Sequence, residues 1–252
     1  MNLPARRVIV GTSVSITDYA EVLGVFESAV AEDQRIYVCC APASTLMFAR
    51  DDAALQAALA DAAVVTPDGM GVVHAARMLG ESIDDRVYGP DLMLAQLERA
   101  AAAGTPTYLY GGFDDAALAA LTAELTSRFP GLQIVGGESP PHRPPTAEEA
   151  AATVAAINES RAQIVWVGLG SPKQELWMQA NRAQLAAPVL CGVGAAFDFF
   201  IGRVDQAPRW MQSRGLEWLY RLFKEPVRLG KRYLLTLPAF VFAVAAQRRR
   251  EK

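Results

Sequence analysis

The sequence predicts an α/β fold: a mostly parallel, Rossmann-like sheet with helices on both faces, followed by a basic, amphipathic helical C-terminal appendage. Short apolar runs alternate with helical patterns of about 10–15 residues, which is typical of a parallel sheet. Glycine-rich turns follow several of these runs, and the charge pattern changes near residue 202. We therefore expect an α/β core over residues 1–202 and a separate appendage over residues 203–252.

The first half of the core is expected to hold three strands, at residues 8–10, 35–40 and 63–66. Apolar residues at helical spacing predict a helix over residues 17–31. Shorter helices are expected at residues 44–50 and 53–60, and Asp51 or Asp52 can cap the second of them. The third strand leads through the turn at residues 67–71 into a helix over residues 72–79.

Four more strands are expected at residues 107–110, 132–135, 164–167 and 188–193. Helices are expected to begin at Gly89, after Asp114 or Asp115, after Thr146 and after the turn that follows residue 167. In parallel sheets, ligands bind beyond the carboxyl ends of the strands. Several glycine-rich turns lie at these ends, so they predict a pocket more strongly together than any one of them does alone.

Charge is divided unevenly between the two parts. Residues 203–252 hold 12 of the 24 Lys and Arg residues but only 4 of the 27 Asp and Glu residues. A basic appendage on an acidic core suggests contact with an anionic surface or ligand, and the alternative is a solvated basic helix. Nucleic acid is a poor candidate, because no zinc or helix-turn-helix signature occurs.

The appendage contains aromatic residues and arginines over residues 208–223, a break at Glu225 and Pro226, and then an apolar stretch ending in three arginines. Its most apolar run, residues 234–246, is 13 residues long and contains Pro238. A span of the bilayer needs about 20 residues. The run suits a helix lying in the membrane interface, and the alternative is a C-terminal helix packed on the core.

The cysteines and the N-terminal segment indicate the cellular compartment of the protein. The chain is 52% hydrophobic, enough for a sizeable core, and its three cysteines form no disulfide framework. We expect no secretory signal peptide, because residues 1–14 lack a long apolar segment and a cleavage site. We therefore expect a reducing, cytoplasmic location.

Residues 163–175, QIVWVGLGSPKQE, combine an apolar run, a glycine turn and the start of a helix. Gly168 and Gly170 let the backbone approach a ligand, and Pro172 suits the first helical position. Such a helix N-terminus can bind an anion. The third glycine of the dinucleotide fingerprint would fall at Lys173, so a connection without any ligand is an equal alternative. Similar turns occur at Gly111 and Gly194.

Charged residues near the strand ends are candidates for chemistry. Asp68, beside Gly69, suits a general base that removes a proton from a hydroxyl, or a cap for the next helix. Arg86 suits a diphosphate or acid contact, or a surface ion pair with Asp84 or Asp85.

Three further polar residues accompany the glycine turns. Gln174 and Glu175 follow the first turn, where a side chain faces the pocket edge, and Glu175 could instead complete a cap. Asp198 lies within an apolar run, so it either binds a ligand or pairs with an arginine.

The basic residues of the appendage suit a diphosphate, whose charge grows as a sugar–phosphate bond breaks. They include Arg209, Arg214, Arg221, Arg228, Lys231 and Arg232. Of these, Arg221, Arg228 and Arg232 share one helix face if the break at Pro226 is mild.

Other classes lack their signatures. No D-x-D motif occurs, and His74 and His142 have no partners at metal-ligand spacing, so we expect no metal ion. No nucleophile elbow or Walker lysine motif supports a hydrolase or a P-loop ATPase.

Five segments together resemble the WecG/TagA/CpsF bacterial glycosyltransferases, glycosyltransferase family 26, and they lie in the order expected for that family. They span residues 66–80, 85–93, 167–178, 192–202 and 207–233. The resemblance implies an inverting, metal-independent glycosyltransferase that moves a sugar from a UDP-sugar to a polyprenyl-diphosphate-linked saccharide. Such an enzyme would act in exopolysaccharide or other cell-surface glycan synthesis, peripherally on the inner face of the cell membrane.

The resemblance also implies roles for single residues. The family's proposed base matches Asp68, its downstream arginine matches Arg86, and its turn glutamine matches Gln174. Its appendage arginines, which close over the diphosphate as a lid, match Arg221 and Arg228, with Lys231 at a third basic position. The remaining predicted substrate contacts are Gly69, Gly111, Gly168, Gly170, Pro172, Glu175, Asp198, Arg209 and Arg214.

The sequence departs from the family pattern near the expected acceptor. Cys40 and Pro42 stand where members often have Thr-x-Asn, Thr66 and Pro67 stand where Asn-Ala is common, and Gln206 stands where an arginine is usual. These departures leave the sugar and the acceptor contacts open. A homo-oligomer also stays open.

Two other hypotheses remain. One is a nicotinamide-dependent oxidoreductase on the same frame, although the third glycine and a ribose-binding acid about 20 residues past Gly168 are missing. The other is a non-enzymatic, nucleotide-sugar-binding membrane module.

Overall fold

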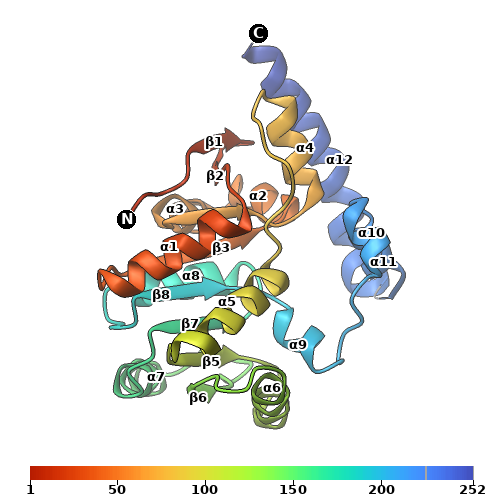
Figure 1. The fold of residues 1–252 in the computed structure, drawn as a ribbon. Coiled ribbons are helices and arrows are strands. Elements are labelled where there is room, and N and C mark those ends of the chain that lie inside the picture. The colour runs from red at the N-terminus through yellow and green to blue at the C-terminus, as the bar shows by residue number, and fades with distance from the viewer. Residues whose placement is uncertain (225, 252) are drawn as a thin grey trace.

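A parallel sheet of six strands forms the centre of the molecule (Figure 1). The computed structural model describes residues 1–224 and 226–251, apart from the side chains of Ser213, Arg221 and residues 226–229 and 231–235. The strand order is β4-β3-β8-β7-β5-β6, and every neighbouring pair is parallel. The strands are β3 (Ile36–Ala41), β4 (Val64–Pro67), β5 (Thr107–Gly111), β6 (Ile134–Glu138), β7 (Ile164–Gly168) and β8 (Val189–Gly192). The predicted Rossmann-like α/β class is confirmed.

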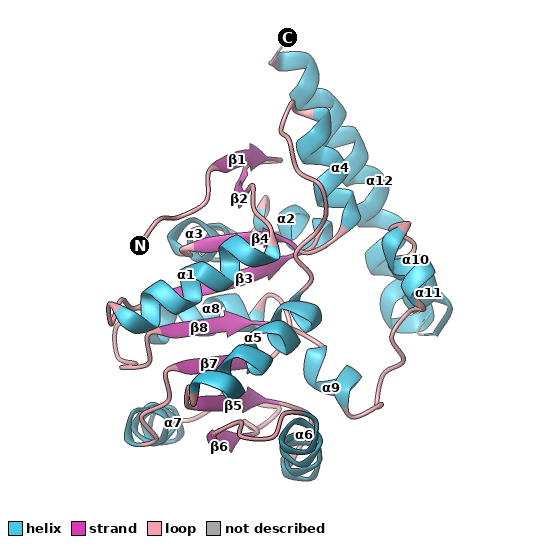
Figure 2. Cartoon of the chain, in the orientation of Figure 1, coloured by secondary structure: helices cyan, strands magenta, loops and turns pink. Residues whose placement is uncertain are grey.

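The strand expected at residues 8–10 does not join this sheet. Instead, β1 (Arg6–Ile9) and β2 (Thr12–Ser15) pair as a small antiparallel hairpin, a second sheet that lies beside β4 (Figure 2). Val10 and Gly11 both have positive φ, at 52° and 88°, as the tightest hairpin turns require. The chain therefore turns back at residue 10 rather than entering a helix.

Helices cover both faces of the sheet (Figure 2). Asp52 accepts hydrogen bonds from two amides at the start of α3, Asp114 caps α6, and Thr146 forms a capping box with Glu149 at α7. These three caps lie at the predicted positions. The core helices are α1 (Tyr19–Ala31), α2 (Ala43–Ala49), α3 (Ala53–Asp61), α4 (Met70–Met78), α5 (Gly89–Ala103), α6 (Asp115–Arg128), α7 (Ala147–Glu159), α8 (Lys173–Asn181) and α9 (Ala196–Phe200).

Two hydrophobic cores lie on opposite faces of the sheet, because successive strand residues point to opposite sides. Along β3, Tyr37 and Cys39 belong to the core that contains residues of α2, α3, α4 and α8. Val38 and Cys40 belong to the other core, with residues of α1, α5 and α6. All three cysteines are buried and free.

The C-terminal appendage consists of α10 (Arg209–Ser213), α11 (Glu217–Lys224) and α12 (Pro226–Arg250). Figure 1 shows α12 beside α4, with both helices leading away from the sheet. Phe240 and Val244 on α12 are buried in the first core, whereas Val241 and Phe242 are exposed. One face of α12 thus packs on the core, as one of the two alternatives anticipated. No helix in the described part of the chain is both long enough and apolar enough to span a bilayer.

Candidate functional site

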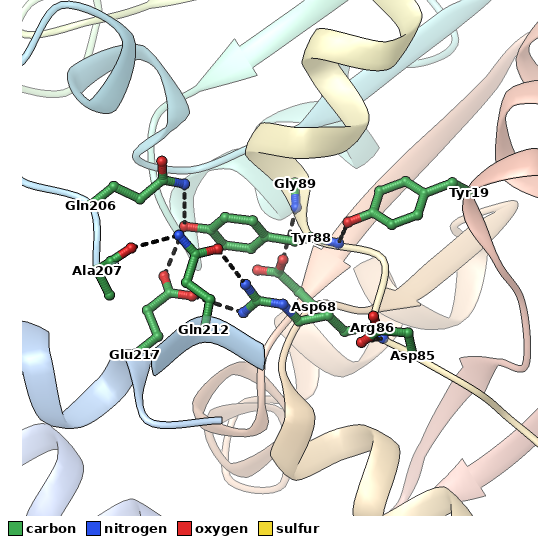
Figure 3. A network of polar contacts seen from close by, with 10 residues as sticks. All are labelled: Tyr19, Asp68, Asp85, Arg86, Tyr88, Gly89, Gln206, Ala207, Gln212 and Glu217. Carbon is green, nitrogen blue, oxygen red and sulfur yellow. Dashed lines mark hydrogen bonds and ion pairs between the residues drawn. The ribbon is translucent and has the colours of Figure 1, made fainter. Parts of the chain in front are cut away.

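Asp68 lies between the carboxyl end of β4 and the first turn of α4. Its carboxylate does not cap α4, whose N-cap residue is Gly69. Instead, the N–H group of Gly89, the first residue of α5, donates to Asp68 Oδ1 at 2.8 Å (Figure 3). The carboxylate therefore sits at the N-terminus of a different helix, where the helix dipole favours negative charge. This contact fixes a carboxylate at the carboxyl edge of the sheet.

Arg86 forms a largely buried ion pair with the appendage. Its Nη1 lies 2.8 Å from Glu217 Oε2 on α11, and its Nη2 donates to Gln212 Oε1 at 3.0 Å (Figure 3). The two charged side chains are only 10% and 12% exposed. The alternative of a surface pair with Asp84 or Asp85 is not what forms, since only the backbone N–H of Arg86 donates to Asp85. The pair connects positions 131 residues apart.

Tyr88 joins the same network. The Arg86 guanidinium lies over its ring, 4.1 Å from the centroid, and its hydroxyl donates to Glu217 Oε1 at 2.7 Å. Both oxygens of Glu217 are thus bound by the core. On the other side, the Tyr88 N–H donates to the Tyr19 hydroxyl at 3.0 Å. Tyr88, in the loop before α5, thus forms hydrogen bonds with residues of both α1 and α11.

The connection between core and appendage contributes two more hydrogen bonds. Gln206 Nε2 donates to the Tyr88 hydroxyl at 3.4 Å, and Gln212 Nε2 donates to the carbonyl of Ala207 at 2.7 Å (Figure 3). Sequence reasoning missed Tyr88, Gln212 and Glu217. The available signal was that Glu217 is one of only four acids in a basic, aromatic segment.

The charge states in the network follow from burial and from Glu217. Burial acts to lower the pKa of Arg86, but the charge and hydrogen bond of Glu217 outweigh it, so this pKa is raised. Burial, followed by the Glu217 charge, raises the pKa of Tyr88. Burial also raises the pKa of Asp91, against the opposing charges of Arg86 and Arg209. Arg86 therefore stays a cation, and Tyr88 stays a neutral donor.

A cavity of about 480 Å³ opens between the Asp68 turn, α4 and the appendage. Its charged or polar lining comes from the β4 end, α4, the loop before α5, the end of α10 and the start of α11, and its apolar lining comes mainly from α4 and α12. The polar group includes Asp68, His74, Arg86, Tyr88, Arg214 and Glu217. The apolar group includes Met70, Ala75, Met78, Leu237, Phe240, Val241 and Val244. Pro42 also lines the cavity.

The glycines at the ends of β5 and β7 and in the turn after β7 have two different kinds of surroundings. A Cβ atom at Gly168 would lie 2.7 Å from the Phe197 ring, and one at Gly111 would lie 2.7 Å from the Gly168 backbone. These two glycines allow neighbouring segments to pack closely. At Gly170, where φ is 75°, an added Cβ would meet no described atom within 4 Å. That position leaves room for a ligand.

Polar residues after this turn connect two strand ends. The N–H of Gly194, after β8, donates to Gln174 Oε1 at 2.9 Å, and Gln174 Nε2 donates to Glu175 Oε1 at 3.1 Å. Gln174 is 2% exposed and Glu175 is fully buried. Pro172 is the N-cap residue, so α8 begins one residue later than expected. Gln174 thus holds the β7 and β8 turns together.

Asp198 on α9 has an arginine partner, one of the two predicted alternatives. Its Oδ1 lies 3.2 Å from Nε of Arg203. Arg203 also lies over the Phe113 ring, 3.9 Å from the centroid, and His142 lies beside the same ring. Asp198 is one-third exposed, so it remains accessible from solvent.

The predicted site residues that the structure describes in full divide into two groups. Those that line the cavity are Asp68, Gly69, Arg86 and Arg214. Outside its lining are Gly111, Gly168, Gly170, Pro172, Gln174, Glu175, Asp198 and Arg209. Strands β3 and β8 separate β4 from β7, a distance of roughly 14 Å at the usual strand spacing. Arg221, Arg228, Lys231 and Arg232 lie on α11 and α12, and their side chains are outside the described part of the structure.

Among the described residues, no three or more His, Cys, Asp or Glu side chains lie close enough together to hold a metal ion.

The whole chain except its first six residues matches one known family. The family is described as "Glycosyl transferase WecG/TagA/CpsF family", and its model matches residues 7–252. The match covers both the α/β core and the appendage. It indicates a glycosyltransferase of cell-surface glycan biosynthesis, which uses a nucleotide-sugar donor and an acceptor.

Proposed function

Since this chain belongs to the WecG/TagA/CpsF family of glycosyltransferases, we propose that it transfers a sugar from a UDP-sugar to a polyprenyl-diphosphate-linked saccharide. The donor is of the UDP-hexose, UDP-hexuronic acid or UDP-N-acetylmannosamine type. The product is an intermediate of an exopolysaccharide or another cell-surface glycan. The observation that supports the proposal most is the cavity in which Asp68 lies beside the buried Arg86–Glu217 pair.

Asp68 is the proposed general base. It takes the proton from the acceptor hydroxyl as that oxygen attacks the anomeric carbon of the donor. The bond between this carbon and the UDP oxygen breaks, and its electron pair leaves with UDP. A single displacement of this kind inverts the anomeric configuration. The hydrogen bond from Gly89 holds one carboxylate oxygen in place, so the base is oriented before the substrate arrives.

Cations at the cavity are proposed to contact the diphosphate groups. Arg86 carries a raised pKa and lines the cavity, and Arg214, which is exposed, lines it as well. Both suit the diphosphate of the acceptor. Arg221, Arg228 and Lys231 are proposed to stabilise the leaving UDP, and for them the support is the family resemblance.

The donor is proposed to lie along the turns after β7 and β8. Gly170 faces open space, and Asp198 is accessible nearby in the chain after the β8 turn. An extended nucleotide diphosphate-sugar bound there could place its sugar toward Asp68. The two substrates would then occupy two neighbouring regions at the same edge of the sheet.

The donor and the reaction can be tested on the purified full chain. A screen of UDP-sugars by thermal unfolding should raise the midpoint with one donor class, because a ligand that binds the folded state stabilises it. UDP release with that donor should then require a lipid-diphosphate-linked acceptor. A shift with NADH and none with any UDP-sugar would favour the oxidoreductase. Tight UDP-sugar binding without transfer to any acceptor would favour the binding module.

Metal independence is a separate part of the proposal. We expect transfer to continue at an unchanged rate in excess EDTA. Loss of activity in EDTA that returns with Mg²⁺ or Mn²⁺ would refute this part and leave the donor and acceptor assignment standing.

Membrane association is proposed to involve α12. Val241 and Phe242 expose apolar side chains, and Arg248, Arg249 and Arg250 lie exposed at the end of the same helix. An apolar surface next to cations suits an anionic bilayer surface. The chain should sediment with anionic vesicles more than with neutral ones, and salt should weaken the difference. Equal binding to both vesicle types would contradict the electrostatic contribution.

A further inference from the structure

We propose that the carboxylate of Glu217 is an internal competitor: it occupies an anion-binding position formed by Arg86 and Tyr88, and a phosphoryl group of a substrate has to displace it. This inference rests on the proposed contact between Arg86 and a diphosphate, and it adds a regulatory step at the same site. The structure then shows the blocked state of that position.

The contacts of Glu217 are those expected of a bound oxyanion. Its Oε2 lies 2.8 Å from Arg86 Nη1, and its Oε1 accepts from the Tyr88 hydroxyl at 2.7 Å. Each carboxylate oxygen thus meets a separate donor, one of them charged. Two oxygens of a phosphoryl group present a similar pair of acceptors, and arginine binds both kinds of anion. The donors that hold Glu217 can therefore hold a phosphoryl group instead.

The blocked position lies inside the cavity, because Arg86, Tyr88 and Glu217 all line it together with Asp68. The ion pair is largely shielded, with the side chains of Arg86 and Glu217 only 10% and 12% exposed. The other terminal nitrogen of Arg86 also has an acceptor, since Nη2 donates to Gln212 Oε1 at 3.0 Å. A phosphoryl group that enters the cavity therefore reaches Arg86 Nη1 by taking the place of Glu217.

Displacement of Glu217 also changes the charge of the cavity. The charged side chains in the described part of its lining are two cations and two anions, Arg86, Arg214, Asp68 and Glu217. Their formal charges cancel while Glu217 is in place. Once Glu217 has turned away, the two arginines exceed the single carboxylate by one charge, which favours an anionic ligand.

The exchange requires rotation of one side chain rather than the loss of a helix. Glu217 is the first residue of α11, so its side chain can turn toward solvent while the helix stays formed. The dipole of α11 favours a negative charge near this terminus in both positions. Other contacts of the appendage remain, among them the hydrogen bond from Gln212 to the Ala207 carbonyl and the buried Phe240.

Binding of inorganic diphosphate to the purified full chain, measured by titration calorimetry, separates this proposal from a purely structural role of the ion pair. Glu217→Asp keeps the charge but shortens the side chain by a methylene group, so the carboxylate no longer reaches both donors. Glu217→Gln keeps the length and removes the charge. Both variants should bind diphosphate at least about 10-fold more tightly than the wild type, because a competitor that blocks about nine-tenths of the molecules lowers the apparent affinity by that factor. A purely structural pair predicts weaker binding, since its loss would loosen the site.

Two further variants are the controls. Asp205→Asn removes a negative charge near α11 but leaves the reach of Glu217 unchanged, because Asp205 pairs with Lys224, is 60% exposed and lies outside the cavity lining. It should bind diphosphate as the wild type does. Adding Arg86→Met to Glu217→Asp should abolish the gain, because it removes the cation for which the two anions compete.

Each outcome decides the proposal. Unchanged or weaker diphosphate binding in both Glu217 variants would overturn it, and so would an equal gain in Asp205→Asn, which would indicate net charge alone. A gain that survives Arg86→Met would also overturn it. If the affinities change as expected but no sugar reaches any lipid-linked acceptor, the internal competition stands and the proposed reaction falls.

Discussion

Two regions at the carboxyl edge of the sheet differ in what holds them together. The turns after β5 and β7 approach each other through glycine, with no room for a Cβ atom at Gly111 or Gly168. The region around Asp68 is held by charge and by hydrogen bonds, above all by the pair between Arg86 and Glu217. The first region is formed by close packing of backbone, and the second by polar contacts between distant segments.

The difference between the two regions shows that a sequence motif alone does not establish a ligand site. A glycine-rich turn suggests a ligand, yet Gly168 has a packing reason of its own, and only Gly170 faces open space. The Arg86–Glu217 pair belongs to no short motif, although it connects the core to the appendage. A conspicuous motif and an important contact are therefore separate properties, and the following variants test the two regions against each other.

The largest effect is expected at Asp68. Asp68→Asn keeps an oxygen that can accept from Gly89, but it removes the base. Transfer should fall about 10²–10⁴-fold, the usual contribution of a general base, while the thermal midpoint changes little. UDP release with saturating donor and acceptor measures this.

A matched carboxylate in the other region gives the control. Asp198→Asn should raise the KM for the donor and leave the maximal rate closer to that of the wild type. Near wild-type turnover of Asp68→Asn would refute the base assignment. An equal loss of maximal rate in both variants would remove the distinction between the two regions.

The buried ion pair should dominate stability in the second region. Glu217→Ala leaves Arg86 without its carboxylate partner, and breaking a buried pair of this kind costs about 3–5 kcal/mol. Denaturant unfolding of Glu217→Ala, Arg86→Met and the double variant measures the coupling between the two residues.

The exposed pair between Arg99 and Glu27 is the control for this cycle, with side chains 43% and 57% exposed. Its coupling should be much smaller, because solvent screens exposed charges. Additive losses at Arg86 and Glu217 would show that the pair does not fasten the appendage to the core.

Smaller effects are expected in the glycine turn, on stability at Gly168 and on donor binding at Gly170. Gly168→Ala should lower the free energy of unfolding by about 1–3 kcal/mol, since the new methyl group overlaps the Phe197 ring. Gly170→Ala should lower the free energy of unfolding by about 1 kcal/mol, because alanine is strained at this positive φ. It should raise the KM for the donor more than Gly168→Ala does. Unfolding curves and donor titrations of both variants separate packing from binding. The reverse order of stabilities would contradict the packing account of Gly168.

Local features of the fold were predictable from the sequence. Asp52, Asp114 and Thr146 cap helices at the predicted places, because a cap depends on a few adjacent residues. The β1–β2 hairpin was missed, since a positive φ at Val10 is unusual for a β-branched residue.

Long-range features of the candidate site were not predictable in the same way. Asp68 and Arg86 were identified by their positions after a strand and in a charged loop, but their partners Gly89 and Glu217 depend on tertiary packing. The packed face of α12 was one of two alternatives, because its apolar run fits a core and a membrane interface equally well. Only the structure shows that Phe240 lies on the packed face of α12 while its neighbour Val241 lies on the exposed face.

Hydrogen exchange with each ligand alone tests most directly whether the two regions bind two substrates. Farnesyl diphosphate should slow exchange of backbone amides in α4, α11 and the described part of α12. UDP should slow it in the turns after β7 and β8, around residues 168–174 and 194–198. Protection of the same segments by both ligands, or no protection of α4 and α12 by farnesyl diphosphate, would contradict the division between donor and acceptor regions.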